Sequence, residues 1–150
     1  KGSHMKLTTV ILSGVTSLLL AAPASAVTLI KSEEANQAPG TGVLTTRGIS
    51  RGPGIKLLSP LENSQVTSPF DLKIGFEPRG GTQIDPSATK IIYLKARPVD
   101  LLPRIKTGLS GKGIDLSNAE TPPGEHQIQI TVQDIEGRVS HSVIQLNVVK

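Results

Sequence analysis

The sequence predicts an all-β domain, and three observations favour that fold class. Residues 70–77 alternate apolar and polar side chains with a period of two, and residues 126–133 repeat the pattern. The apolar runs after residue 54 are short and are separated by Gly, Pro, Asn and Asp, which are typical of turns. Beyond residue 26, no stretch has the i, i+3, i+4, i+7 apolar spacing of an amphipathic helix. We therefore expect an antiparallel sandwich of about seven strands, with an aliphatic core because the chain has only two Phe, one Tyr and no Trp.

The first 26 residues are predicted to be absent from the mature protein. Residues 1–5 resemble the remnant of an expression tag, with Met5 as the native start. Residues 6–26 are organised like a secretory signal peptide, in which a positive charge and a short apolar stretch precede the small residues Ala24-Ser25-Ala26. Because Ser, Thr and Gly interrupt the apolar stretch, it is too short to span a membrane stably. We therefore expect a periplasmic or secreted protein that is cleaved after Ala26.

Charge and cysteine content exclude several classes of site. The whole chain has 16 basic and 12 acidic residues, and without Lys1 and Lys6 the counts become 14 and 12, a net charge of +2. This small excess, with almost no aromatic residues, argues against a nucleic-acid-binding surface. The absence of Cys excludes disulfides and thiolate metal ligands.

Two regions are expected after the signal peptide. Residues 27–54 are polar and rich in Gly and Pro, so they cannot bury enough apolar surface to offset the cost of ordering, and we predict a flexible leader. A short strand at residues 43–46 is the one regular element that we expect there. Residues 55–150 form the predicted β-sandwich domain.

The strands of this domain are predicted from apolar runs and their breakers. Pro98 and Pro103 exclude a central strand between them, because proline cannot donate to a sheet ladder. Residues 84–87 are predicted to form a turn or a short helical turn. The expected strands lie at residues 55–58, around Val66, at 70–77, within 89–96, around Ile105, at 114–116, at 126–133 and at 138–148.

The last two strands are predicted to form a hairpin with a defined register. Asp134 to Gly137 fit a type I turn that ends in a left-handed glycine, and such a turn closes a three-residue hairpin loop. Asp134 and Gly137 are therefore assigned a structural role. The loop pairs Ile130 with Ser142, Ile128 with Ile144 and His126 with Leu146, and it turns the apolar side chains inward.

Two segments of the domain resemble bacterial immunoglobulin-like domains. Residues 123–137 are similar to the penultimate strand and final turn of that family, with a Pro-Gly-x-His opening and an Asp-x-x-Gly turn. Residues 59–66 are similar to its opening Ser-Pro turn. The resemblance covers residues 54–150 and implies a β-sandwich of structural, adhesive or accessory function. The Cys pair and core Trp of antibody domains are absent, and His126 or its neighbourhood takes the place of a corner Tyr.

No catalytic or metal-binding constellation is predicted, and no cofactor is expected. In the predicted register, His126 faces inward and His141 outward, so the two imidazoles cannot ligate one metal ion. His126 is expected to be a strand-end side chain bonded to backbone. The flanking Ser140 and Ser142 point away from His141 and do not form a nucleophile–base pair with it.

The sequence favours a non-catalytic module that binds another envelope or secreted protein. The outward face of the last hairpin carries a half-apolar strip, which we define as Gln129, Thr131, Val139, His141 and Val143. Either the leader or another strand covers this strip, or a partner protein contacts it. The alternative is a small periplasmic metal- or ligand-binding protein, or a hydrolase, that uses His126 or His141.

Overall fold

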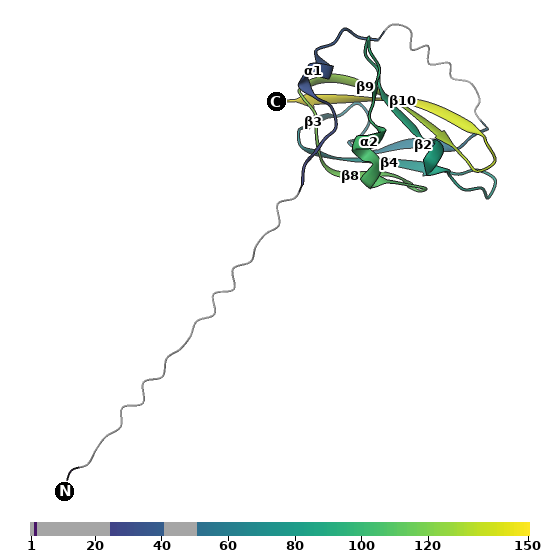
Figure 1. The fold of residues 1–150 in the computed structure, drawn as a ribbon, viewed down its shortest axis with the longest axis horizontal. Coiled ribbons are helices and arrows are strands. Elements are labelled where there is room, and N and C mark those ends of the chain that lie inside the picture. The colour runs from purple at the N-terminus through teal and green to yellow at the C-terminus, as the bar shows by residue number, and fades with distance from the viewer. Residues whose placement is uncertain (1, 3–24, 41–50) are drawn as a thin grey trace.

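The protein is a two-layer β-sandwich (Figure 1). The computed structural model describes residues 2, 25–40 and 51–150. The first sheet contains, in spatial order, β1 (Val27–Thr28), β8 (Gly113–Glu120), β4 (Phe70–Glu77) and β2 (Gly54–Ser59), and β7 (Leu109–Ser110) also pairs with β8. The second sheet contains, in spatial order, β3 (Gln65–Thr67), β10 (Val139–Val149), β9 (Gly124–Gln133), β5 (Lys90–Tyr93) and β6 (Val99–Asp100). The all-β sandwich predicted from the sequence is confirmed.

Alternating strands supply the core between the two sheets. The apolar positions of β4 are buried while its polar positions are exposed, as the period of two predicts. The aliphatic side chains of β9 and β10 pack against them from the second sheet. Tyr93 is fully buried, and both Phe side chains also belong to this core. The expected aliphatic core with inward-facing Phe residues is therefore confirmed.

The N-terminal segment is part of the sandwich. The sequence predicts a flexible leader over residues 27–54, whereas residues 27–40 instead pack against the sheets. β1 pairs with β8, and the helix α1 (Ser32–Ala35) follows it. Leu29 and Ile30 lie in the core with 0% and 2% of their surface exposed. The free energy gained by burying these side chains offsets the conformational entropy that the segment loses when it becomes ordered. The predicted strand at residues 43–46 lies outside the described residues.

Two strand pairs depart from a purely antiparallel arrangement. β1 runs parallel to β8, and β3 runs parallel to β10. Both parallel strands have only two or three residues, so each adds to a sheet edge whose other pairs are antiparallel. All other strand pairs are antiparallel, as the predicted antiparallel sandwich requires, and the two short edge strands add parallel pairs to it.

The segment between β6 and β7 is helical rather than extended. A strand was expected around Ile105, but this residue ends the helix α2 (Leu102–Ile105), and the 3₁₀ turn η2 (Lys106–Gly108) follows. Ile105 is 1% exposed. Its burial in the core stabilises this short helical turn, although the sequence there lacks the apolar periodicity of an amphipathic helix. A second 3₁₀ turn, η1 (Pro86–Ala88), lies where the sequence predicts a helical turn. β6 forms a sheet edge, in agreement with the exclusion of a central strand between Pro98 and Pro103.

The predicted signal peptide falls almost entirely on residues that are not described. Of residues 6–26, only Ser25 and Ala26 are described, and both are exposed and precede β1. Within the described part of the chain, no helix is long and apolar enough to cross a membrane.

Candidate functional site: the outer face of the last hairpin

The β9–β10 hairpin has the register that the sequence predicts. Ile130 pairs with Ser142, Ile128 with Ile144, and His126 with Leu146. Gly137 has a φ of +85°, the left-handed conformation that makes glycine the favoured residue at this position. The turn places Leu146 inside the sandwich and His141 on its outer face.

Asp134 holds this turn from within. Its carboxylate accepts hydrogen bonds from the backbone N–H groups of Glu136 at 3.0 Å and Arg138 at 2.9 Å, and from the Arg138 Nε–H at 2.8 Å. Burial by itself would raise the pKa of Asp134, but the Arg138 hydrogen bonds and positive charge hold it below its usual value. These contacts and the left-handed φ of Gly137 place both residues in the turn, and the structural role assigned to them stays a prediction.

The strip residues lie together on the outer face of the second sheet. Thr131 and His141 are directly opposite each other, and Thr131 Oγ1 lies 2.9 Å from His141 Nδ1. Gln129 is paired with Val143, and this pair lies on the same face as the Thr131–His141 pair, two residues farther along each strand. Val139 is 40% exposed, His141 is exposed, and the other three side chains are half-buried. The arrangement combines aliphatic contact area with amide, hydroxyl and imidazole hydrogen-bonding groups.

Part of the predicted leader contacts one end of the strip. Gly52 and Pro53 are buried, and Gly52 lies against the backbone of Val139. A Cβ atom at Gly52 would lie 2.7 Å from the Val139 carbonyl and 2.5 Å from Ser140 Oγ, so glycine permits this close approach. Gly52 of the predicted leader therefore packs against the backbone at the Val139 end of the hairpin, while the Val139 side chain stays 40% exposed.

His126 is a buried structural residue at the start of β9. It is 2% exposed, its Nε2 lies 2.7 Å from the Pro122 carbonyl oxygen, and its Nδ1 lies 2.8 Å from the Tyr93 hydroxyl. Because a carbonyl can only accept, Nε2 carries the proton and Nδ1 accepts from Tyr93. The predicted bond from His126 to backbone is confirmed, and both of its ring nitrogens are engaged.

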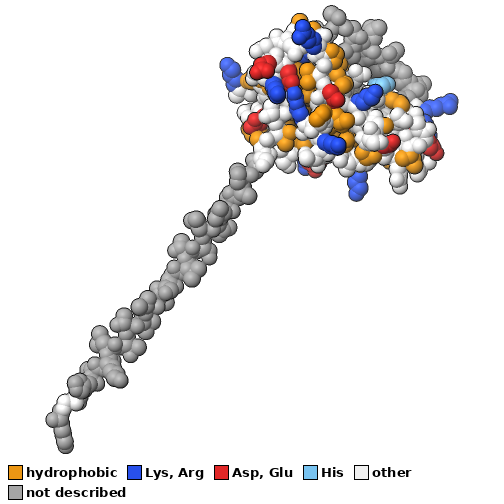
Figure 2. Space-filling view, viewed as in Figure 1, with side chains coloured by type: hydrophobic (Ala, Val, Ile, Leu, Met, Phe, Trp, Pro, Cys, Tyr) orange, Lys and Arg blue, Asp and Glu red, His pale blue; other side chains and the backbone are white. Residues whose placement is uncertain are grey.

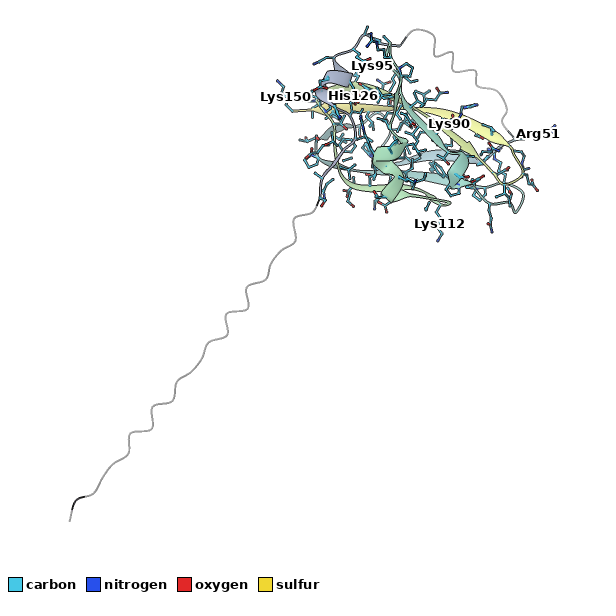
Figure 3. The ribbon with its side chains drawn as sticks, viewed as in Figure 1. Arg51, Lys90, Lys95, Lys112, His126 and Lys150 are labelled. Carbon is cyan, nitrogen blue, oxygen red and sulfur yellow. The ribbon has the colours of Figure 1, made fainter. Side chains whose placement is uncertain are left out.

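Burial also sets the protonation of this pair. Desolvation lowers the pKa of His126, the bond to Pro122 partly opposes that effect, and the positive charge of Lys95 adds to it. Burial, assisted by the charge of Glu34, raises the pKa of Tyr93 to about 12. The Lys95 ammonium lies 5.5 Å from the centre of the Tyr93 ring. Figure 3 shows Lys95 and His126 at the same end of the sandwich.

The two histidines are separated as the sequence predicts. His126 faces the core, whereas His141 lies on the outer face, so they do not converge on one site. Within residues 25–40 and 51–150, no three His, Asp or Glu side chains are grouped so that they could hold a metal ion.

Basic side chains are spread over the molecule. Figure 2 shows Lys and Arg side chains around the whole outline of the visible face, with Asp and Glu among them. The labelled residues Arg51, Lys90, Lys112 and Lys150 in Figure 3 lie well apart. These four labelled residues thus do not form one basic patch.

One ion pair near the N-terminal segment was missed by the sequence analysis. Arg104 on α2 donates two hydrogen bonds to the Glu34 carboxylate on α1, at 2.7 and 2.5 Å, and a third to the Leu29 carbonyl at 3.0 Å. The Arg104 hydrogen bond lowers the pKa of Glu34, and Glu34 raises that of Arg104. Glu34 and Arg104 are 70 positions apart, so no local pattern could have predicted their contact.

The comparisons with known proteins add little about function. No protein family model and no curated protein matches the sequence. The structure is similar to CopC from Methylosinus trichosporium OB3b, with a TM-score of 0.43 and 18% identity over 63% of this chain and 93% of that chain. It is also similar to an endo-β-1,4-mannanase from Thermotoga petrophila, with a TM-score of 0.45 and 16% identity over 71% of this chain and 21% of that one. At these TM-scores neither similarity supports an inference about function.

Proposed function

We propose that this chain is an exported, non-catalytic protein-interaction module with an immunoglobulin-like fold. The observation that carries the proposal is the strip on the outer face of β9 and β10, where Val139, His141 and Val143 lie beside Gln129 and Thr131. Strand faces that combine exposed aliphatic and hydrogen-bonding side chains are typical of protein contact surfaces. The partner is another envelope or secreted protein.

The order of the strands supports the immunoglobulin-like part of the proposal. β2, β4 and β8 are adjacent in one sheet, and β10, β9 and β5 are adjacent in the other. Labelled A, B, C, E, F and G along the chain, these strands follow the A-B-E and G-F-C neighbour orders of that fold. His126 bonds back to the carbonyl of Pro122, four residues upstream, as the corner Tyr of the family does.

Export is supported by where the first strand begins. Cleavage after Ala26 would make Val27 the first residue of the mature chain, and Val27 is also the first residue of β1. Ser25 and Ala26 are exposed and belong to no helix or strand. Cleavage between Ala26 and Val27 would therefore leave the first sheet intact.

Affinity capture from the native envelope, with matched surface variants, tests this proposal. Val143→Glu places a carboxylate within the strip, and we expect it to reduce partner capture at least tenfold. Ser117→Glu makes the same kind of charge change on an exposed residue of β8 in the other sheet, and we expect capture to be unchanged. Equal capture by both variants would remove the strip from consideration as the contact surface.

The histidine-based alternative is separated by a second measurement. Both ring nitrogens of His126 are already engaged, so no observation favours a metal carrier or hydrolase over the binding module. Calorimetric titration with Zn²⁺ and Cu²⁺ compares the wild type with a His126→Ala/His141→Ala double variant. Metal uptake that is lost in the variant, while partner capture is absent from the wild type, would replace the proposed function with this alternative.

A further inference from the structure

The four sheet ends differ in their capacity to accept another strand. β1, β3 and β6 have two or three residues, whereas β2 has six. β2 lies at the end of its sheet, and among the described residues no strand pairs with its second side. β10 extends beyond β3, but Gly52 lies against its first residues. β2 is therefore the sheet end with the length to pair with an added strand.

β2 has some but not all of the features that prevent strand addition, since its pairing with β4 is irregular between Leu57 and Ser59, as at a β-bulge. It contains no Pro, and Lys56 is its one charged residue. Ile55 and Leu57 face inward and pack against the core, while Lys56 and Leu58 face outward. The unpaired backbone edge of β2 is thus flanked by an apolar inner row and a mixed outer row.

The outward-facing positions of β2 present an acidic, a basic and an apolar group one after another. A Cβ atom at Gly54 would lie 3.2 Å from Glu77 Oε2, so the Glu77 carboxylate occupies the space above this glycine. Lys56 follows two positions later, and Leu58, which lies over Gly75, is 50% exposed. Within the described residues neither Glu77 nor Lys56 has an ion-pair partner in the chain itself. An added strand would meet a carboxylate, an ammonium group and a leucine at successive outward positions.

We infer that β2 accepts an extended segment of a partner protein as an antiparallel strand, with an apolar–x–acidic–x–basic pattern on its outward positions. This inference goes beyond the proposed function, because β2 lies in the first sheet and the strip on β9 and β10 lies in the second. The apolar residue lies beside Leu58, the acidic residue beside Lys56 and the basic residue beside Glu77. Cross-strand pairs of opposite charge stabilise a sheet, whereas like charges directly opposite destabilise it.

Two synthetic peptides of identical composition test the charge order. The first is acetyl-Thr-Leu-Val-Glu-Val-Lys-Thr-amide, and the second exchanges its Glu and Lys. We expect the first peptide to bind the full chain about five- to tenfold more tightly, because the exchange places the peptide Lys opposite Lys56 and the peptide Glu near the Glu77 carboxylate that lies over Gly54. Hydrogen exchange with the bound peptide should show new protection at residues 54–59.

Variants of the protein place the binding on β2. Lys56→Glu should abolish or reverse the preference between the peptides, whereas Lys90→Glu, the same change on β5 of the other sheet, should preserve it. Circular dichroism of both variants confirms that they are folded. Equal binding of the two peptides, no binding, or protection of residues 139–146 in place of 54–59 would overturn the inference. Those outcomes leave capture through the Val143 strip unaffected, so failure here is distinguishable from failure of the proposed function.

Discussion

At the scale of single residues, two buried polar side chains define the hairpin that carries the candidate site. His126 is held at one end between Pro122 and Tyr93, and Asp134 is held at the other end by Arg138. Each side chain has its hydrogen-bonding groups satisfied, which avoids the cost of an unpaired polar group in the interior. The hairpin is therefore fixed at both ends, and its outer face carries the candidate site.

The neutral state of His126 predicts a fall in stability with acidification. The pKa of His126 is lowered below 6.5 in the folded protein, so the unfolded chain takes up the proton first as the pH falls. The free energy of unfolding should be constant above about pH 7.5 and then decrease below pH 6.5, by at most about 1.4 kcal/mol per pH unit. Urea denaturation between pH 8 and pH 5 measures this dependence.

Two glutamine variants serve as controls for that titration. His126→Gln should flatten the dependence between pH 7.5 and pH 5, because the buried titrating group is gone. His141→Gln makes the same substitution at the exposed imidazole on the outer face and serves as the matched control. A slope that persists in the His126 variant would show that another group produces it.

The glycine of the turn gives a second residue-level prediction. Gly137→Ala should destabilise the protein by about 1–2 kcal/mol, because a Cβ is unfavourable at a φ of +85°. Gly111→Ala is the matched control, since a Cβ there would make only an ordinary contact with the Ile84 carbonyl oxygen, at 3.8 Å. Thermal unfolding monitored by circular dichroism compares the two, and an equal loss would contradict the role given to Gly137.

At the scale of elements, the ion pair between α1 and α2 joins two short helices that could not persist alone. Each helix has four residues, and isolated helices of that length are unstable in water. Glu34 and Arg104 are 15% and 22% exposed, and their contact is bidentate. Such a pair is stronger than a fully exposed one.

A double-mutant cycle measures how much this pair contributes. Glu34→Gln and Arg104→Gln should each destabilise the protein, and their combination should reveal a coupling free energy of about 1 kcal/mol. The coupling should vanish at low pH, because protonation of Glu34 removes the stabilisation as the pH falls through its lowered pKa. Additive effects at pH 7 would show that the two side chains act independently.

The elements differ in how far the sequence could predict them. The period of two in β4 and β9 and the turn at Gly137 predict the strands, their register and the side of the sheet on which His141 lies. Leu29 and Ile30 end the short apolar run that begins at Val27 and precede a polar stretch, so the run is too short for a period to indicate that they are buried. α2 forms because Ile105 meets the core and Arg104 meets Glu34, and both contacts depend on tertiary structure.

At the scale of the whole molecule, the N-terminal segment completes the core that both sheets share. Leu29→Ala should destabilise the protein by about 2–4 kcal/mol, because it leaves a cavity at a position with 0% exposure. Leu61→Ala, at a position with 73% exposure, should change the free energy of unfolding by less than about 0.5 kcal/mol. Guanidinium denaturation of both variants tests this difference, and a small effect of Leu29→Ala would mean that the segment is only loosely attached.

The parallel pairs of β1 with β8 and of β3 with β10 also bear on how the chain folds. Val27 pairs with Ala119, and Gln65 pairs with Asn147. β1 and β3 can therefore pair only after β8 and β10, which are much later in the sequence, have been synthesised. Folds dominated by such distant contacts reach their native state slowly. We expect the native fold to form only after β10 has been synthesised, a delay that would keep the chain extended enough for the export that we propose.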